Sequence, residues 1–255
     1  MSPGTLYLVP NTLDFGVASE AVAAPLSDVL PDAALRIAAR LPHWAAESAK
    51  TTRAFLKRVD AIAPLAQPLQ AIQIVELPRP NKGSKAAVEF AALEPLLAPA
   101  LQGHDIGLIS EAGMPAIADP GAALVEAAHR LGVPVVALPG PNSLLLALAT
   151  SGLNGQSFAF VGYMPVDAAE RVARIRELEA WSRRAGQTQL FIETPYRNEA
   201  LLAALLASLS PQTRLSVSCG LTLPQAWTRS DTVARWRAAP TALAKDIPAV
   251  FCLLA

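Results

Sequence analysis

The chain has 255 residues, of which 52% are hydrophobic and only 5% aromatic, and its formal net charge is zero. A core built from Ala, Leu, Val and Ile suits helices packed on a buried parallel sheet. The longest apolar runs, at 144–149 and 249–255, are far shorter than the roughly 20 residues that cross a bilayer. No basic segment precedes an apolar run at the N-terminus. We therefore expect a cytoplasmic protein without a membrane segment.

Cysteine and histidine indicate neither a disulfide framework nor a metal site. Cys219 and Cys252 each lie in an apolar, strand-like run, so we expect two buried thiols, as in a reducing compartment. The three histidines share no metal-ligand spacing with one another or with the cysteines. The sequence therefore predicts no metal.

Charge is distributed unevenly along the chain. Residues 50–85 contain seven basic and two acidic side chains, although the whole chain is neutral. A local basic segment could contact phosphate groups. A solvated helix face followed by a loop would have the same composition, so both interpretations stay open.

The first half of the chain alternates between strands and helices. Residues 6–9 read as a strand that Pro10 ends, 42–60 as a helix, 72–77 as a strand, 78–84 as a loop and 86–101 as a helix interrupted by two prolines. A strand at 106–109, a helix at 120–131, a strand at 134–138 and a helix at 142–150 follow. This alternation is typical of a parallel sheet with right-handed crossovers.

The pattern changes in the second half. Helices at 168–185 and 198–208 lie among strands at 158–161, 188–193, 215–219, around 226–228 and at 249–254. Closely spaced strands near the end indicate a mixed or antiparallel sheet. We therefore predict an α/β protein of two domains, 1–153 and 154–255, with a mostly parallel sheet in the first and a mixed sheet in the second.

Two strand-to-helix loops look most like a ligand site. The first reads Ser110-Glu-Ala-Gly-Met-Pro-Ala-Ile-Ala-Asp-Pro-Gly121, in which Asp119 can cap the next helix and Pro120 can open it. The second reads Leu138-Pro-Gly-Pro-Asn-Ser143, in which either of the last two residues can cap the helix. Open α/β sheets bind ligands at the carboxyl ends of their strands, where both loops would lie. Neither loop has the glycine pattern of a dinucleotide or triphosphate site.

These loops belong to a longer series of motifs. Together with F-A-F-V-G-Y-M-P at 158–165 and F-I-E-T-P-Y-R at 191–197, they resemble successive motifs of the tetrapyrrole methylase superfamily. The ribosomal RNA small-subunit methyltransferase I group is the most similar within it. Order and spacing match over about residues 104–198, and residues 6–10 resemble the family's first strand.

The resemblance implies a homodimer that binds S-adenosylmethionine (SAM) in the cleft between its two domains. The implied SAM contacts, taken by position from the family's motifs, are Pro10, Ser110, Glu111, Ala112, Gly113, Ile117, Asn142, Ser143, Tyr163, Glu193 and Thr194.

Two segments depart from the pattern of the ribosomal RNA group. Where that group has G-N-L-G-D-I-T after the first strand, this chain has Asn11-Thr-Leu-Asp-Phe-Gly-Val17. Where it has E-D-T-R, this chain has Glu47-Ser-Ala-Lys-Thr-Thr-Arg53, which keeps the Glu and loses the Asp. Both segments would lie near the substrate, so the cofactor half of the site matches the family better than the substrate half.

The implied reaction is methyl transfer to RNA, at a ribose 2′-hydroxyl of ribosomal RNA. A base or a cation beside the hydroxyl would assist it. The candidates are Glu47, Lys50 and Arg53, which are spaced three residues apart on the predicted helix and would share one face, as a surface ion-pair row also would. Glu193 is a further candidate base, or it holds a neighbouring loop.

Two other functions stay open. One is methylation of a small molecule, a tetrapyrrole or a corrinoid. The other is SAM binding without turnover. The basic loop at 79–85 favours RNA because it can contact phosphates, although the carboxylates of a tetrapyrrole would also attract it.

Overall fold

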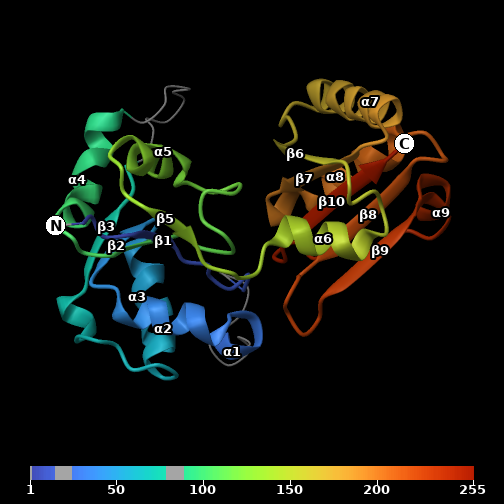
Figure 1. Ribbon diagram of the computed structural model, residues 1–255. Helices are drawn as coiled ribbons and strands as arrows, with labels where there is room; N and C mark the ends of the chain where they lie inside the picture. The colour runs from blue at the N-terminus through green and yellow to red at the C-terminus, as the bar shows by residue number, and fades with distance from the viewer. Residues whose placement is uncertain (1, 15–24, 79–88) are drawn as a thin grey trace. The chain divides into compact units, whose positions relative to one another are not determined.

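The computed structural model describes residues 2–14, 25–78 and 89–255. They fall into two compact units, one formed by the described residues up to 141 and the other by residues 142–255 (Figure 1). Each unit is built on its own five-stranded sheet. The predicted α/β class, with a parallel first sheet and a mixed second sheet, is confirmed.

The first sheet has the order β3-β2-β4-β1-β5, and all its strands run parallel. The strands are β1 (Leu6–Leu8), β2 (His43–Ala46), β3 (Gln73–Glu76), β4 (Ile106–Ile109) and β5 (Val135–Ala137). All four residues of β4 are buried, because this strand lies inside the sheet with helices on both faces. Gly107 is paired with Trp44, and a Cβ at Gly107 would lie 2.7 Å from the Trp44 ring, so this glycine makes room for the indole.

Two layers of helices cover this sheet. One core cluster joins the sheet to α1 (Leu26–Val29), α2 (Asp32–Arg40) and α3 (Ala49–Asp60). A second cluster joins it to α4 (Phe90–Leu101) and α5 (Ala122–Arg130). A short 3-10 turn, η1 (Leu69–Ala71), precedes β3. Because all five strands run parallel, the loops that lead from a strand to the next helix lie at one edge of the sheet, its carboxyl edge.

The second sheet has the order β6-β7-β10-β8-β9. Its strands are β6 (Phe158–Tyr163), β7 (Thr188–Glu193), β8 (Arg214–Cys219), β9 (Trp227–Thr232) and β10 (Ala249–Leu254). Only β6 and β7 run parallel, and the other neighbours are antiparallel. The residues of β10 alternate between two core clusters, so both faces of this central strand are buried.

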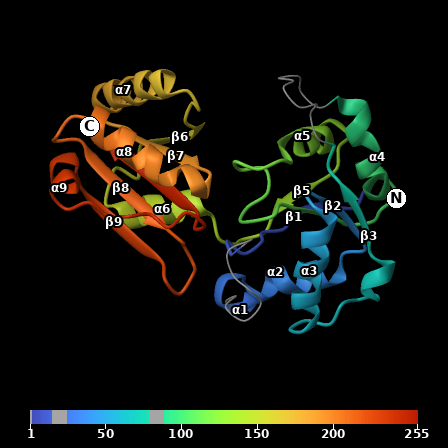
Figure 2. The ribbon, with the colours of Figure 1, turned by 180° about the vertical axis from the view of Figure 1, so that it is seen from behind.

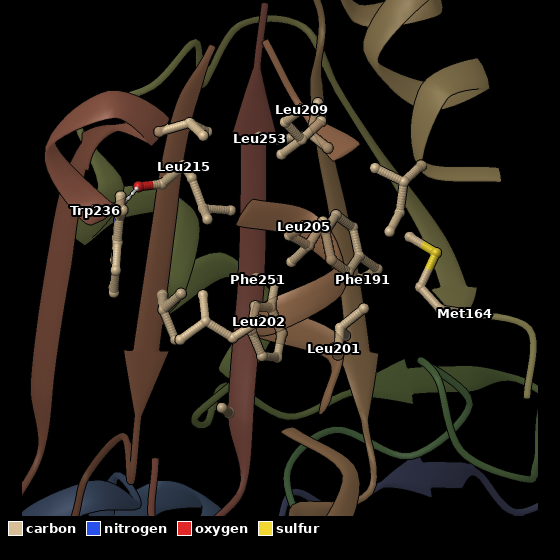
Figure 3. Packing of buried hydrophobic residues seen from close by; sticks show 14 of the residues in the cluster. Met164, Phe191, Leu201, Leu202, Leu205, Leu209, Leu215, Trp236, Phe251 and Leu253 are labelled. Carbon is tan, nitrogen blue, oxygen red and sulfur yellow. Dashed lines mark hydrogen bonds between the residues drawn. The ribbon is translucent and has the colours of Figure 1, made fainter. Parts of the chain in front are cut away.

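Helices cover both faces of the second sheet (Figure 1, Figure 2). On one side lie α7 (Ala168–Ala185), α8 (Asn198–Ser208) and α9 (Val233–Ala238), packed around Phe191, Phe251 and Trp236 (Figure 3). The Trp236 indole N–H donates to the Leu215 carbonyl, which satisfies the polar atom of this buried ring. On the other side lies α6 (Ser143–Ser151). A boundary near residue 154 would assign α6 to the first unit, whereas its contacts place it with the second.

The helix predicted for residues 42–60 is wrong in its first part. His43–Ala46 forms β2, paired with β3 and β4, and the helix begins only at Ala49. Ser48, two residues after the strand, caps the helix, since its Oγ accepts the Thr51 N–H. The loop predicted for 78–84, with its basic residues 79–85, falls almost wholly outside the described residues, and so do residues 15–17 of the first departing segment.

The expectation of two buried thiols is confirmed. Cys219 and Cys252 are buried free thiols, and burial raises the pKa of Cys252 to about 12. No helix in the described part of the chain is long and apolar enough to cross a bilayer.

Candidate functional site

The segment after β1 is joined to the loop after β4 by a set of hydrogen bonds. The Asn11 N–H donates to the Gly113 carbonyl at 2.9 Å, and the Gly113 N–H donates to the Thr12 carbonyl at 3.2 Å. The Asn11 side-chain amide donates to the carbonyls of Ser110 and Glu111, at 3.2 and 3.0 Å. Because β1 and β4 are neighbours, these bonds bring Pro10 and residues 110–113 to one place at the carboxyl edge.

The loop from Ser110 to Gly121 has an unusual backbone. Gly113 and Gly121 have positive φ, and so do Ala116 and Ala118, at 66° and 65°. This conformation costs an alanine about 1 to 2 kcal/mol, so the surrounding structure must hold the loop. Ile117 lies between the two alanines, and 45% of it is exposed. The loop therefore presents an apolar side chain on a constrained backbone.

The predicted cap of the following helix is wrong. Gly121, with a φ of 130°, occupies the N-cap position of α5, and no side chain caps this helix. Asp119 therefore lies within the loop, where its carboxyl is free to interact with other groups at the edge.

The loop after β5 packs closely on the end of β1. A Cβ at Gly140 would lie 2.3 Å from the Cβ of Pro10, so only glycine fits here. Asn142 caps α6 as predicted, with its Oδ1 accepting the Leu145 N–H at 3.1 Å. Ser143 is the first residue of that helix. The side-chain oxygen of Asn142, which is predicted to contact SAM, therefore already accepts one hydrogen bond as the cap of α6.

The three candidate catalytic residues do not form a row on one helix. Glu47 follows β2, whereas Lys50 and Arg53 lie exposed on the first turns of α3. Side chains alternate along a strand, and Ala45 belongs to the core cluster of α4 and α5, so Glu47 points to that face of the sheet. Helix α3 packs on the opposite face. The sequence predicts a row only because residues 43–46, which form β2, read as part of the same helix.

Ser48 stands where the ribosomal RNA group has Asp. Serine and aspartate are both preferred N-cap residues, and the Ser48 Oγ accepts the Thr51 N–H. Glu76, at the end of β3, also accepts the Ala49 N–H at 2.8 Å. The substitution therefore preserves the start of α3 and removes only a negative charge.

Arg58 connects α3 to the segment that follows β1. Its Nη1 lies 3.4 Å from Asp14 Oδ2 and 3.5 Å from Thr12 Oγ1, and Thr12 in turn donates to Asp14. Thr12 and Asp14 are both buried. A cation on α3 thus stabilises the segment that carries Asn11.

Three acidic side chains lie together at the carboxyl edge, and we call Glu47, Glu111 and Asp119 the acidic cluster. The Glu111 N–H donates to Glu47 Oε2 at 3.0 Å. Burial raises the pKa of Asp119 to about 7, and repulsion from Glu47 and Glu111 contributes to this rise. Near neutral pH, Asp119 is therefore shared between its protonated and ionised forms.

Asp119→Asn is expected to stabilise the protein at pH 8. Between pH 4 and 7 the folded chain holds a proton that the unfolded chain has lost, so the wild type loses stability as pH rises through this window and no more above it. The amide stays neutral throughout. Allowing for the partial exposure of Asp119, we expect a gain of about 1 to 2 kcal/mol at pH 8. Urea unfolding at pH 4, 6 and 8 measures it, and a gain independent of pH would contradict the assignment.

Residues 32–234 match the model for tetrapyrrole (corrin/porphyrin) methylases, which is most of both units. The chain belongs to the tetrapyrrole methylase family.

Two curated relatives of this tetrapyrrole methylase carry the same name, ribosomal RNA small subunit methyltransferase I. The protein from Halalkalibacterium halodurans is 31% identical over 206 residues, which are 81% of this chain and 61% of the relative. The protein from Mesorhizobium japonicum is 38% identical over 129 residues, 50% of this chain and 42% of the relative. The chain thus spans about half the length of these relatives.

The same fold occurs in a solved structure. Uroporphyrin-III C-methyltransferase from Thermus thermophilus, complexed with S-adenosylhomocysteine (SAH), is 19% identical, with a TM-score of 0.52 over 98% of this chain and 97% of that one. At this identity the likeness establishes the fold of the tetrapyrrole methylase.

In the second unit of this tetrapyrrole methylase, the predicted site residues lie at the ends of two parallel strands. Tyr163 ends β6 with 59% of its surface exposed, and Glu193 ends β7. Glu193 Oε2 lies 2.7 Å from Arg197 Nη2, and its Oε1 accepts the Thr194 N–H at 2.8 Å. This geometry gives Glu193 the alternative role of holding the turn that follows β7.

Asn11 and Asp119 were missed as site residues in the sequence, and both had a usable signal. Each follows a strand of the parallel sheet, at the edge where ligands bind. In the sequence, Asn11 belongs to a segment that departs from the family and Asp119 reads as a helix cap. The order of the strands brings β1 beside β4, and so places Asn11 against the loop that contains Asp119.

Proposed function

We propose that this chain transfers a methyl group from SAM to the RNA of the small ribosomal subunit, at a ribose 2′-hydroxyl. The observation that carries the proposal is the shared name of the two curated relatives, one of which aligns over 81% of the chain. We also expect the protein to act in the cytoplasm and as a homodimer.

The carboxyl edge of the first sheet supports binding of the donor. Asn11 joins the segment after β1 to the loop after β4. The loop after β5 packs against the same segment through the close fit of Gly140 on Pro10. In such a reaction the cofactor supplies the reactive methyl group and the protein supplies its orientation. We assign the donor to Pro10, residues 110–113 and Ile117, whereas the contacts of Asn142 and Ser143 with SAM stay predictions. The roles of Tyr163, Glu193 and Thr194 towards SAM stay predictions.

The exposed basic residues of α3 support an RNA acceptor. Lys50 and Arg53 are exposed on the first turns of this helix, which begins at the same edge of the sheet. Exposed cations beside the donor would hold a phosphate backbone. Lys50 or Arg53 would also stabilise the acceptor oxygen as its proton leaves.

Methyl uptake from tritiated SAM tests the proposal. The purified chain is incubated with small ribosomal subunits, or with uroporphyrinogen III, which stands for the tetrapyrroles. We expect label in RNA, recovered as a 2′-O-methylated nucleoside. Label in the tetrapyrrole alone would favour the small-molecule alternative. SAM binding without label in either acceptor would favour a protein that binds SAM without turnover.

A further inference from the structure

Asp14 is a buried carboxylate in the segment after β1. Only 9% of its side chain is exposed, and in the part of the chain that the structure describes its ion-pair partner is Arg58, whose Nη1 lies 3.4 Å from Asp14 Oδ2. Thr12 donates its hydroxyl hydrogen to the other oxygen of this carboxylate. A carboxylate that is taken out of water needs an opposite charge as well as hydrogen-bond donors. The buried position of Asp14 therefore depends on Arg58.

Arg58 reaches this segment from the last turn of α3. Side chains of an α-helix tilt toward its N-terminus, and α3 begins at the carboxyl edge of the first sheet, so the long side chain of Arg58 extends toward that edge. Its Nη1 also lies 3.5 Å from Thr12 Oγ1. One guanidinium thus contacts both Thr12 and Asp14, while 34% of the Arg58 side chain stays exposed.

Thr12 connects this ion pair to the loop after β4. Its carbonyl accepts the Gly113 N–H at 3.2 Å, and its own N–H donates to the Asn11 side-chain oxygen at 2.9 Å. The Asn11 amide in turn donates to the carbonyls of Ser110 and Glu111. Because these bonds are direct and the segment is short, a shift of the ion pair would displace the loop that we assign to the donor.

The side chains at both ends of this network stand in one of the two segments that depart from the ribosomal RNA group. Asn11 and Asp14 occupy the positions at which the stretch G-N-L-G has its two glycines. Glycine has no side chain, so it could make neither the contacts of Asn11 nor the ion pair of Asp14. The departure therefore brings a requirement with it, since a cation on α3 must hold the segment in place.

We propose that Arg58 is a positioning residue of the donor site, which holds the loop after β4 in the conformation that binds SAM by fixing Thr12 and Asp14. This inference rests on the proposed function. Arg58 acts on the donor through the segment after β1 and not by contact. Its charge is needed because Asp14 is buried, so removing both charges together should weaken binding less than removing the cation alone.

Calorimetric titration with SAH, well below the unfolding temperature, tests the proposal. In Arg58→Gln we expect the Kd for SAH to rise about 3- to 30-fold, the usual range for a substitution in a network that is coupled to a binding site. Arg58→Lys keeps the charge but not the planar fork of donors, and should recover part of this loss. Adding Asp14→Asn to Arg58→Gln should return the Kd to within about threefold of the wild type, because the carboxylate that needed the cation is gone.

Arg40→Gln is the matched control. Arg40, at the end of α2, also forms an ion pair with an aspartate of the same unit, Asp105, at 3.6 Å, but Asp105 precedes β4 and lies at the amino edge of the sheet. We expect the Kd of this variant to equal that of the wild type. Circular dichroism and thermal unfolding on the same preparations show whether each variant is folded. A purely structural role of Arg58 would lower its unfolding temperature and leave the Kd of the folded protein unchanged.

An unchanged Kd in folded Arg58→Gln overturns the inference and leaves the proposed function standing. A weaker Kd that Asp14→Asn does not restore would mean that Arg58 contacts the donor directly, and this also overturns the positioning role. If Arg58→Gln does not fold, the double variant decides: a Kd within about threefold of the wild type supports the inference, and a larger loss overturns it. If the wild-type chain binds neither SAH nor SAM, the inference and the proposed function are both overturned.

Discussion

Arg197→Ala is expected to lower the free energy of unfolding by about 3 to 5 kcal/mol, because it leaves a buried carboxylate without its partner. The Glu193 side chain is 2% exposed and lies 2.7 Å from the guanidinium of Arg197, which is itself 22% exposed. The Glu193 carboxylate would keep its hydrogen bonds from Thr194 but lose the opposite charge. Urea unfolding followed by circular dichroism measures the loss.

Arg183→Ala is the matched control for this substitution. Arg183 and Glu179 are also an arginine and a glutamate four residues apart, but their atoms lie 3.9 Å apart and Arg183 is 60% exposed. We expect a loss below about 1 kcal/mol. Equal losses for the two variants would contradict the account of the Glu193–Arg197 pair.

The Glu193→Gln variant distinguishes two possible roles of this carboxylate. If this carboxylate holds the turn after β7, Glu193→Gln lowers stability and methyl transfer together. If it is the base of the reaction, Glu193→Gln lowers methyl transfer while stability stays close to that of the wild type. The hydrogen bond from Thr194 and the ion pair with Arg197 favour the first role.

Lys50→Ala and Arg53→Ala are expected to reduce methyl transfer to RNA by about a hundredfold or more, the usual range for a group that assists proton transfer. SAM affinity should change by less than about threefold. Both side chains are exposed on α3, whereas the loops proposed to bind SAM follow β1, β4 and β5. Methyl uptake and calorimetry on the same preparations separate the two effects.

Lys57→Ala is the control for these variants. Lys57 has the same charge and is exposed on the last turn of the same helix, away from the carboxyl edge. It should retain most of the activity if the acceptor lies beside the first turn. Full activity in both Lys50→Ala and Arg53→Ala would show that the acceptor site has been misplaced.

The elements with a clear hydrophobic periodicity or a clear boundary could be predicted from the sequence. Strand β4 and helices α7 and α8 have the predicted bounds, and Asn142 caps α6 as expected. Strand β2 could not be separated from α3, because a short apolar run buried on both faces has no alternation and reads equally well as the start of a helix. Helix α2 was overlooked although its buried residues recur at helical spacing.

The site depends on long-range pairing that no local pattern contains. Strand β1 lies between β4 and β5, which follow it by about a hundred residues or more. This order brings Asn11 to the loop after β4 and Gly140 to Pro10. The loops themselves were recognisable, whereas the position of Glu47 on the α5 face required the pairing of β2 with β4.

Hydrogen–deuterium exchange with and without SAH at pH 8 tests most directly whether the donor binds at the carboxyl edge of the first sheet. We expect slower exchange for backbone amides in residues 11–14 and 110–121, which include the amides of Asn11 and Gly113 that join the two loops. The hairpin of β8 and β9 should exchange at an unchanged rate. Unchanged exchange in both loops at a saturating concentration of SAH would contradict the placement of the donor site.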